Sequence, residues 1–318
     1  MSATAVSRAR VVFELPTVIK GFQEDARTRE EATPVRMITE LGTHYYEIHR
    51  ESQTSTSLAD LKKIVQITLK LTDENYIVQV IGDSRPFSIE GTATGLRFLD
   101  RAIETHAYVL YGYTGCSFRS GVKCVNALTS AYLESHALLD KAIASVVGYQ
   151  TVSTLSSGSC RAPDLSNYVV VYGDNETSVK TGTFFGDDIE TSDYLADRLV
   201  LLEGGCQSFI QACNILSMGK PICSLTGLRD RSSQSYFSAA EFLHFIATES
   251  SKVGEEEIDR EFLDSLKNKY LLSHSLADPK KPHYKKKIAL LEKAWNLFVE
   301  KRLDKNFYLL KTYTPTSF

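Results

Sequence analysis

The chain has 318 residues, 43% of them hydrophobic and 24% charged, and its formal net charge at pH 7 is −3. This composition is typical of a globular protein, and the length suggests two domains or one large domain with additions. The small negative charge excludes a general electrostatic attraction to nucleic acid. The apolar runs are far shorter than the roughly 20 residues that a membrane-spanning helix needs, and the N-terminal stretch lacks the apolar core of a signal peptide, so we expect no membrane partner.

The first 94 residues have a weak and mixed pattern. Short strands are predicted at residues 10–15 and 43–51. Two further strands are predicted at residues 64–71 and 76–81, joined by a turn with the sequence TDEN that suits a hairpin. We therefore expect a mixed α/β addition over residues 1–94.

Residues 95–230 alternate between apolar strands and amphipathic helices, which is the pattern of a parallel α/β sheet. The predicted strands lie within residues 107–115, 167–175, 197–205 and 219–225, and the predicted helices within residues 95–106, 122–135, 137–149 and 209–216. We therefore predict a Rossmann-like domain, in which helices cover both faces of a parallel sheet.

Residues 231–318 have a mainly helical pattern. Apolar side chains recur at helical spacing in residues 255–270 and 288–303, and a Pro- and Lys-rich break separates these two segments. We therefore expect a helical C-terminal region.

Two glycine-containing loops follow predicted strands, and the first is LYGYTGCSFRSGVK at residues 110–123. Glycine lets the backbone approach an anion closely, and the N-terminus of the next helix offers N–H groups to it. The residues that could bind a phosphate or carboxylate in this loop are Gly112, Gly115, Ser117, Arg119 and Lys123. The loop matches neither GxxxxGK[ST] nor GxGxxG, and the alternative is a solvated loop whose cations only maintain solubility.

The second loop is LLEGGCQSFIQ, in which a strand is followed by paired glycines, a hydroxyl and a helix. It resembles the PGGxGTxxE element of the LOG and lysine-decarboxylase-like proteins, which belong to the SLOG superfamily of Rossmann-like nucleotide-binding domains. Gly204, Gly205 and Ser208 match the glycines and the hydroxyl of that element. The pairs Ala196–Asp197 and Lys220–Pro221 resemble the starts of the family's two neighbouring strands.

This resemblance implies that the glycines wrap a nucleotide phosphate that faces the helix N-terminus. The chain departs from the motif at three positions: the proline is Glu203, the third glycine is Gln207, and the acid of the family's phosphoribohydrolases falls on Gln211. An amide cannot replace a carboxylate as a general base, so Gln211 is expected to bind ligand only. Glu203, beside the glycines, is the candidate catalytic carboxylate, and Asp174 is either a ligand-binding or a turn residue.

The functional expectation is binding of a nucleotide or nucleotide-derived ligand, with possible hydrolysis of its N-glycosidic bond. The alternatives are a non-catalytic nucleotide sensor or protein-interaction module with a degenerate site, and a scaffold with a disused pocket. The resemblance also implies a homodimer. The six cysteines have neither CxxC nor zinc-site spacing, so we expect free thiols, a cytoplasmic location and no metal, and we expect no cofactor.

Overall fold

The computed structural model describes ten parts of the chain. They are residues 34–38, 44–50, 58–83, 86–112, 125–147, 168–172, 192–229, 238–253, 265 and 307–317.

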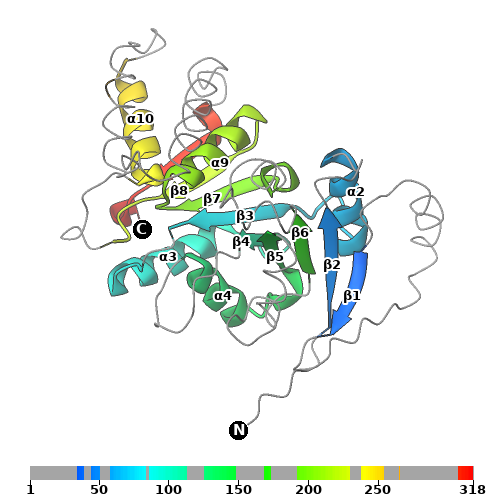
Figure 1. Ribbon diagram of the computed structural model, residues 1–318. Coiled ribbons are helices and arrows are strands. Elements are labelled where there is room, and N and C mark those ends of the chain that lie inside the picture. Colours follow the sequence, from blue (N-terminus) through cyan, green and yellow to red (C-terminus); the bar gives the residue numbers. More distant parts are fainter. Residues whose placement is uncertain are drawn as a thin grey trace, which may run out of the picture.

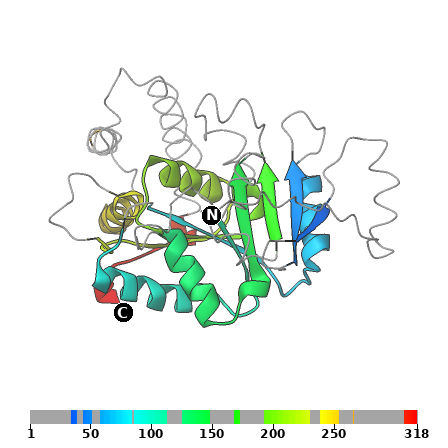
Figure 2. The same cartoon turned by 60° about the horizontal axis from the view of Figure 1, so that its bottom comes forward.

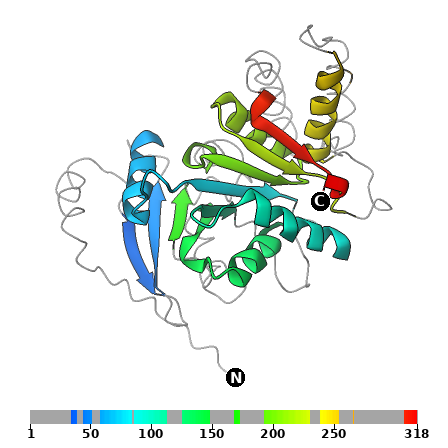
Figure 3. The same cartoon turned by 180° about the vertical axis from the view of Figure 1, so that it is seen from behind.

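A single sheet runs through the described residues (Figure 1). Its strands are β1 (Pro34–Ile38), β2 (His44–Arg50), β3 (Ile77–Gly82), β4 (Tyr108–Gly112), β5 (Ala142–Val147), β6 (Tyr168–Tyr172), β7 (Arg198–Leu202), β8 (Ile222–Leu225) and β9 (Leu310–Tyr313). Their spatial order is β1-β2-β6-β5-β4-β3-β7-β8-β9. All neighbours are parallel except β1 and β2, which are antiparallel. In Figure 3, β9 lies beside β8 at one edge and β1 lies at the other.

Helices cover both faces of this sheet, as the view in Figure 2 shows. The labelled α-helices are α2 (Leu58–Leu69), α3 (Ile89–Ala102), α4 (Val125–Ser135), α9 (Cys206–Ser217) and α10 (Ala239–Val253). Short 3-10 helices are η2 (Leu139–Lys141), η5 (Phe307–Leu309) and η6 (Pro315–Ser317). The predicted Rossmann-like architecture is thereby confirmed.

β3 lies in the middle of the sheet, and its side chains alternate between the two faces. Val78 and Val80 are fully buried in a core that includes residues of α3 and α4. On the opposite face, Ile77 packs with residues of α2, and Ile81 packs with residues of α9 and α10. A parallel strand buried on both faces needs an almost continuous apolar run, which explains the sequence IVQVIG.

The strand predicted at residues 64–71 is wrong, because this segment belongs to helix α2. Ile64, Val65 and Leu69 are buried, whereas Lys63 and Gln66 are exposed, so the buried residues follow a helical face rather than an alternation. The hairpin predicted between residues 71 and 76 is wrong for the same reason, since β3 pairs with β4 and β7.

The helix predicted at residues 137–149 is also wrong, because the segment forms η2 and then β5. Ala142, Ile143 and Ala144 are consecutive and each is 0–1% exposed, which is the burial of a strand covered on both faces. A short apolar run of this kind has no periodicity that distinguishes a strand from a helix.

The C-terminal region is not wholly helical, because β9 returns to the sheet and pairs with β8. α10 confirms the helical character of its beginning, whereas the helices predicted at residues 255–270 and 288–303 lie outside the described residues apart from Ser265. The expected boundary after residue 94 falls inside α3, and β1, β2 and β3 before it belong to the same sheet. The strand predicted at residues 10–15 lies outside the described residues.

Candidate functional site

The carboxyl ends of β3, β4, β7 and β8 all point in the same direction and lie side by side, because these neighbouring strands are parallel. After β3, the chain forms β4 on one side of β3, and it later forms β7 on the other side of β3. The strand order therefore reverses at β3. In open α/β sheets, ligands bind outside the carboxyl ends of the strands at such a reversal of strand order. Only β3 separates β4 from β7, so the two predicted ligand loops leave the sheet about 10 Å apart at the usual strand spacing.

The first of these loops lies almost wholly outside the described residues. Gly112 ends β4, and Gly115, Ser117, Arg119 and Lys123 fall within residues 113–124. α4 begins directly after this loop, and the main-chain N–H of its first residue donates to the carbonyl oxygen of Asp83, the residue after β3, over 3.2 Å. The loop therefore ends beside the reversal point. Asp174 also lies outside the described residues.

The second loop forms a tight turn at residues 203–205, which we call the glycine turn. Glu203 and Gly204 have φ angles of 58° and 92°, so two consecutive residues adopt left-handed conformations. A Cβ on Gly204 would lie 2.6 Å from the Cβ of Ser208, which is itself buried. Backbone conformation and packing therefore both require glycine at position 204.

Gly205 differs from Gly204, because neither its conformation nor its surroundings require glycine. Its φ and ψ are −106° and −159°, which any residue adopts, and a Cβ there would meet nothing within 4 Å. Gly205 is the N-cap of α9 and, being glycine, has no side chain that could cap this helix. Residue 205 therefore leaves the first-turn N–H groups of α9 without a side-chain cap of its own.

In the described part of the segment after β3, residues 83 and 86–88, the start of the next helix is capped. Ser88 caps α3, since its hydroxyl oxygen accepts a hydrogen bond from Gly91 N over 2.8 Å. The N–H of Ser88 donates to the carbonyl oxygen of Leu228 over 3.0 Å, and a Cβ on Gly91 would overlap that same carbonyl. The position that holds phosphate in dinucleotide-binding Rossmann domains is therefore occupied by the protein's own backbone.

Glu203 is engaged by the segment that follows β8. It is 1% exposed, and its carboxylate accepts hydrogen bonds from Leu228 N over 2.7 Å and from the Thr226 hydroxyl over 3.3 Å. Burial raises the pKa of Glu203, and these hydrogen bonds oppose the rise. The carboxylate is thus directed toward residues 226–228 of the protein itself.

The reversal point also holds an ion pair that sequence reasoning missed. Asp83 follows β3, Arg229 follows β8, and the Arg229 Nη2 atom pairs with an Asp83 carboxylate oxygen. The two residues are 5% and 8% exposed. Burial lowers the pKa of Arg229 to about 10, so the guanidinium stays charged at neutral pH. The only signal in the sequence was the position of Asp83 directly after a buried strand.

No protein-family model matches this chain, and no curated protein matches it. The resemblance to SLOG proteins therefore remains a prediction, and the geometry of the site has to carry the functional interpretation. Within the described ranges, no group of three His, Cys, Asp or Glu side chains could hold a metal ion. No helix in those ranges is long and apolar enough to cross a bilayer.

Gln211, which occupies the position of the family's acid, belongs to a polar cluster beneath α9. Its amide nitrogen lies 3.2 Å from Asp193 Oδ1 and 3.5 Å from the Ser192 hydroxyl. Asn214 donates to Asp193 Oδ2 over 3.1 Å, and Gln79 of β3 donates to Ser192 over 3.1 Å. Asp193 is 0% exposed, and burial raises its pKa to about 8, against the lowering effect of these hydrogen bonds. Gln211 therefore links α9 to β3 through residues 192–193.

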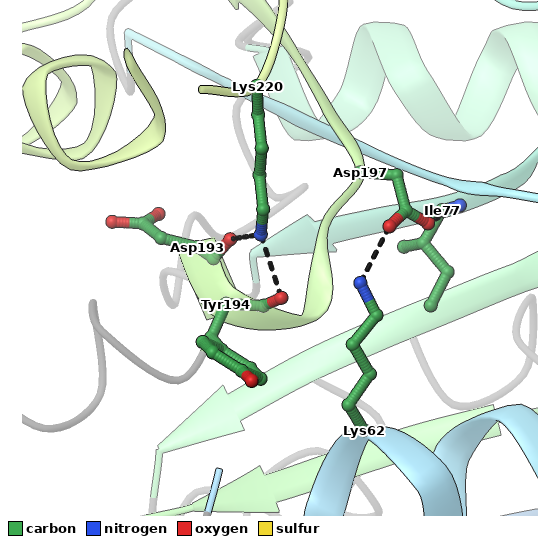
Figure 4. Close-up of polar contacts among 6 residues, drawn as sticks. All are labelled: Lys62, Ile77, Asp193, Tyr194, Asp197 and Lys220. Carbon is green, nitrogen blue, oxygen red and sulfur yellow. Dashed lines mark hydrogen bonds and ion pairs between the residues drawn. The ribbon is translucent and has the colours of Figure 1, made fainter. Parts of the chain in front are cut away.

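The pairs that resemble the family's strand starts directly precede β7 and β8, at the amino ends of these strands. Figure 4 shows Asp197 and Lys220 of these pairs with their polar partners. Asp197 accepts hydrogen bonds from Lys62 Nζ over 2.6 Å and from Ile77 N over 2.9 Å. Lys220 Nζ donates to the carbonyl oxygens of Asp193 and Tyr194, over 2.7 and 2.8 Å, at the end of a helical turn at residues 192–195. A cation stabilises such an end. These residues tie α2, β3, β7 and β8 together, away from the glycine turn.

Proposed function

We propose that this protein binds a nucleotide or nucleotide-derived ligand, and that its phosphate group lies against the glycine turn and the first turn of α9. The proposal is supported by the position of this turn at the reversal of strand order, where ligands of open α/β sheets bind. It is also supported by the helix that follows, because unpaired N–H groups and the helix dipole favour an anion. Gly204 and Gly205 of the turn and Ser208 of the first turn of α9 are the residues that we propose to bind the phosphate there.

The observation that carries the proposal is the environment of Gly205. A glycine that the backbone does not need, at an uncapped helix N-terminus with open space beside it, is accounted for by close approach of a ligand. Ser, Asp or Asn at this position would cap α9 and stabilise it, but would also fill the place of the anion.

The charge of the ligand has to be balanced mainly by main-chain groups and by the first loop. Among the described residues at this edge, Asp83 neutralises Arg229, and Glu203 adds a carboxylate. We propose that Arg119 and Lys123 supply the cationic groups, with Gly112, Gly115 and Ser117 shaping the loop that carries them. We also propose that Asp174 and Gln211 bind the ligand at a greater distance from its phosphate group.

Binding without turnover is better supported than hydrolysis. Hydrolysis of an N-glycosidic bond needs a carboxyl group that reaches the reacting atoms. The raised pKa of Glu203 favours it as a proton donor, but this residue is 1% exposed and its carboxylate already accepts hydrogen bonds from Leu228 N and the Thr226 hydroxyl, among other groups of the protein. A nucleotide sensor is therefore our first candidate, and a nucleotide N-glycosidase that uses Glu203 is the second.

Substitution of Gly205 by aspartate tests the binding site directly. In the Gly205→Asp variant, the new carboxylate caps α9 and competes with the phosphate. Calorimetric titration should detect binding of AMP but not adenosine to the wild-type protein, and no binding of AMP to the variant. Gly219→Asp is the matched control, because it adds the same charge at the other end of α9, in open space and at a φ of 70°. Equal AMP affinity in all three proteins would refute the site.

Incubation with AMP, NAD and ADP-ribose separates the two candidates. A sensor binds at least one of them and releases no free base or nicotinamide, whereas an N-glycosidase releases it at a rate that Glu203→Gln abolishes. Release that continues in the Glu203→Gln variant would require a different catalytic group.

The oligomeric state and the compartment are also proposals. A homodimer follows from the resemblance to LOG proteins, and light scattering after size-exclusion chromatography would test it. A cytoplasmic location is supported by Cys213 and Cys223, which are free thiols in the structure.

A further inference from the structure

The N-terminus of α10 contacts the glycine turn directly, although the two segments are separated in the chain by α9 and β8. The N–H of Ala239 donates to the carbonyl oxygen of Gly204 over 2.9 Å, and the N–H of Ala240 donates to the carbonyl oxygen of Glu203 over 3.0 Å. Both alanines are 0% exposed. Two first-turn N–H groups of α10 are therefore used to hold the two left-handed residues of the turn.

Ser238 connects the start of α10 with the side chain of Glu203. Its hydroxyl oxygen accepts a hydrogen bond from Glu241 N over 3.0 Å, as an N-cap residue does. The same hydroxyl hydrogen-bonds the carboxylate of Glu203. Glu203 thus contacts α10 through both its main chain and its side chain.

The opposite side of the turn is held by the segment after β8. Glu203 N donates to the carbonyl oxygen of Leu225 over 3.0 Å, and the carboxylate of Glu203 receives the hydrogen bonds from Leu228 N and the Thr226 hydroxyl. A non-glycine residue at a φ of 58° is uncommon and needs such fixed surroundings. The position of the N–H groups that follow in α9 depends on the conformation of this residue.

We propose that Glu203 is a positioning residue, which together with the main-chain N–H groups of Ala239 and Ala240 forms a clamp that holds the glycine turn ready for an anion. The clamp couples the ligand site to α10, so ligand binding tightens the contact between α10 and the turn, and a docked α10 strengthens ligand binding to the same extent. This inference rests on the proposed function, because it takes the first turn of α9 as the ligand site.

Hydrogen exchange of individual amides, measured by NMR, tests the clamp together with the affinity for AMP. In Glu203→Ala, the amides of Ala239 and Ala240 should exchange about tenfold faster and AMP should bind about tenfold more weakly. Glu203→Gln keeps an acceptor of the same shape and should restore both values to within about threefold of the wild type. Ser238→Ala should change both readouts in the same direction as Glu203→Ala, by a smaller factor.

Three results would overturn the inference. One is weakened AMP binding in Glu203→Ala with unchanged exchange at Ala239 and Ala240, which would make Glu203 a ligand contact. Another is a Glu203→Gln variant as impaired as Glu203→Ala. The third is AMP binding to the wild-type protein that leaves the exchange of these amides unaltered relative to the amide of Leu133 in α4. This last measurement uses the wild-type protein alone and does not depend on the folding of a variant. If the wild-type protein binds no AMP, the proposed function fails, and exchange in the ligand-free variants still decides whether the clamp exists.

Discussion

Substitution of Asp193 by asparagine should remove a specific part of the pH dependence of stability. Asp193 is 0% exposed, and burial raises its pKa from 3.8 to about 8. Between these two values the folded protein retains a proton on Asp193 that the unfolded chain has released. The unfolded state therefore binds fewer protons, and the free energy of unfolding falls as pH rises.

The expected size of this effect follows from the distance between the two pKa values. The slope is at most about 1.4 kcal/mol per pH unit for one proton, and the loss accumulated between about pH 4 and about pH 8 is on the order of 5 kcal/mol. The stabilisation is fully present at acid pH, below the pKa of the unfolded chain, and is lost as pH approaches the folded-state value. Glu203 adds a slope of the same sign, because burial raises its pKa as well.

Urea denaturation at several values between about pH 5 and about pH 8 measures the slope. Asp193→Asn should have a clearly shallower dependence than the wild type, since an amide does not titrate. The amide oxygen can accept the hydrogen bond from Gln211, and the amide NH2 group can donate to the side-chain oxygen of Asn214 once that amide has turned. Asp73→Asn, at an exposed turn, is the control and should keep the wild-type slope. Identical slopes for wild type and Asp193→Asn would show that Asp193 is ionised in the folded protein.

Three further substitutions test the packing of the site. Arg229→Met should lower the free energy of unfolding by about 3–5 kcal/mol, because it removes one partner of a buried ion pair, and adding Asp83→Asn should recover part of the loss; no recovery would show that the pair is not coupled. Gly91→Ala should cost about 1–3 kcal/mol because its Cβ would overlap the carbonyl of Leu228; a melting temperature equal to that of the wild type would contradict this close contact. Gly205→Asp should raise the free energy of unfolding by a few tenths of a kcal/mol, because aspartate caps a helix N-terminus better than glycine does. A melting temperature below that of the wild type would contradict the absence of a side-chain cap at residue 205.

The central strands could be predicted from the sequence because they are buried on both faces. β3, β4, β7 and β8 are short, almost continuous apolar runs, and glycine or polar residues follow each of them. The sequence of β6 has the same apolar pattern. Other elements, β1 among them, could not be predicted. β5 and α2 have apolar residues whose spacing does not separate helix from strand, and β9 is a four-residue edge strand that depends on its pairing with β8.

The glycine turn could also be predicted, because paired glycines between a buried strand and a helix indicate a close backbone approach. The direction of the Glu203 side chain could not, since it depends on the left-handed conformation of this residue and on partners that lie beyond β8. The pairing of Asp83 with Arg229 could not be predicted either, because it depends on the order of strands in the sheet.

The most direct test of the anion site is an NMR titration of the labelled protein with AMP, with adenosine as the control ligand. Our account predicts that AMP shifts the amide resonances of residues 205–208 more than any resonance of α3 or α4, and that adenosine does not. An AMP titration that leaves these four amides unmoved, or that moves the start of α3 instead, would contradict it.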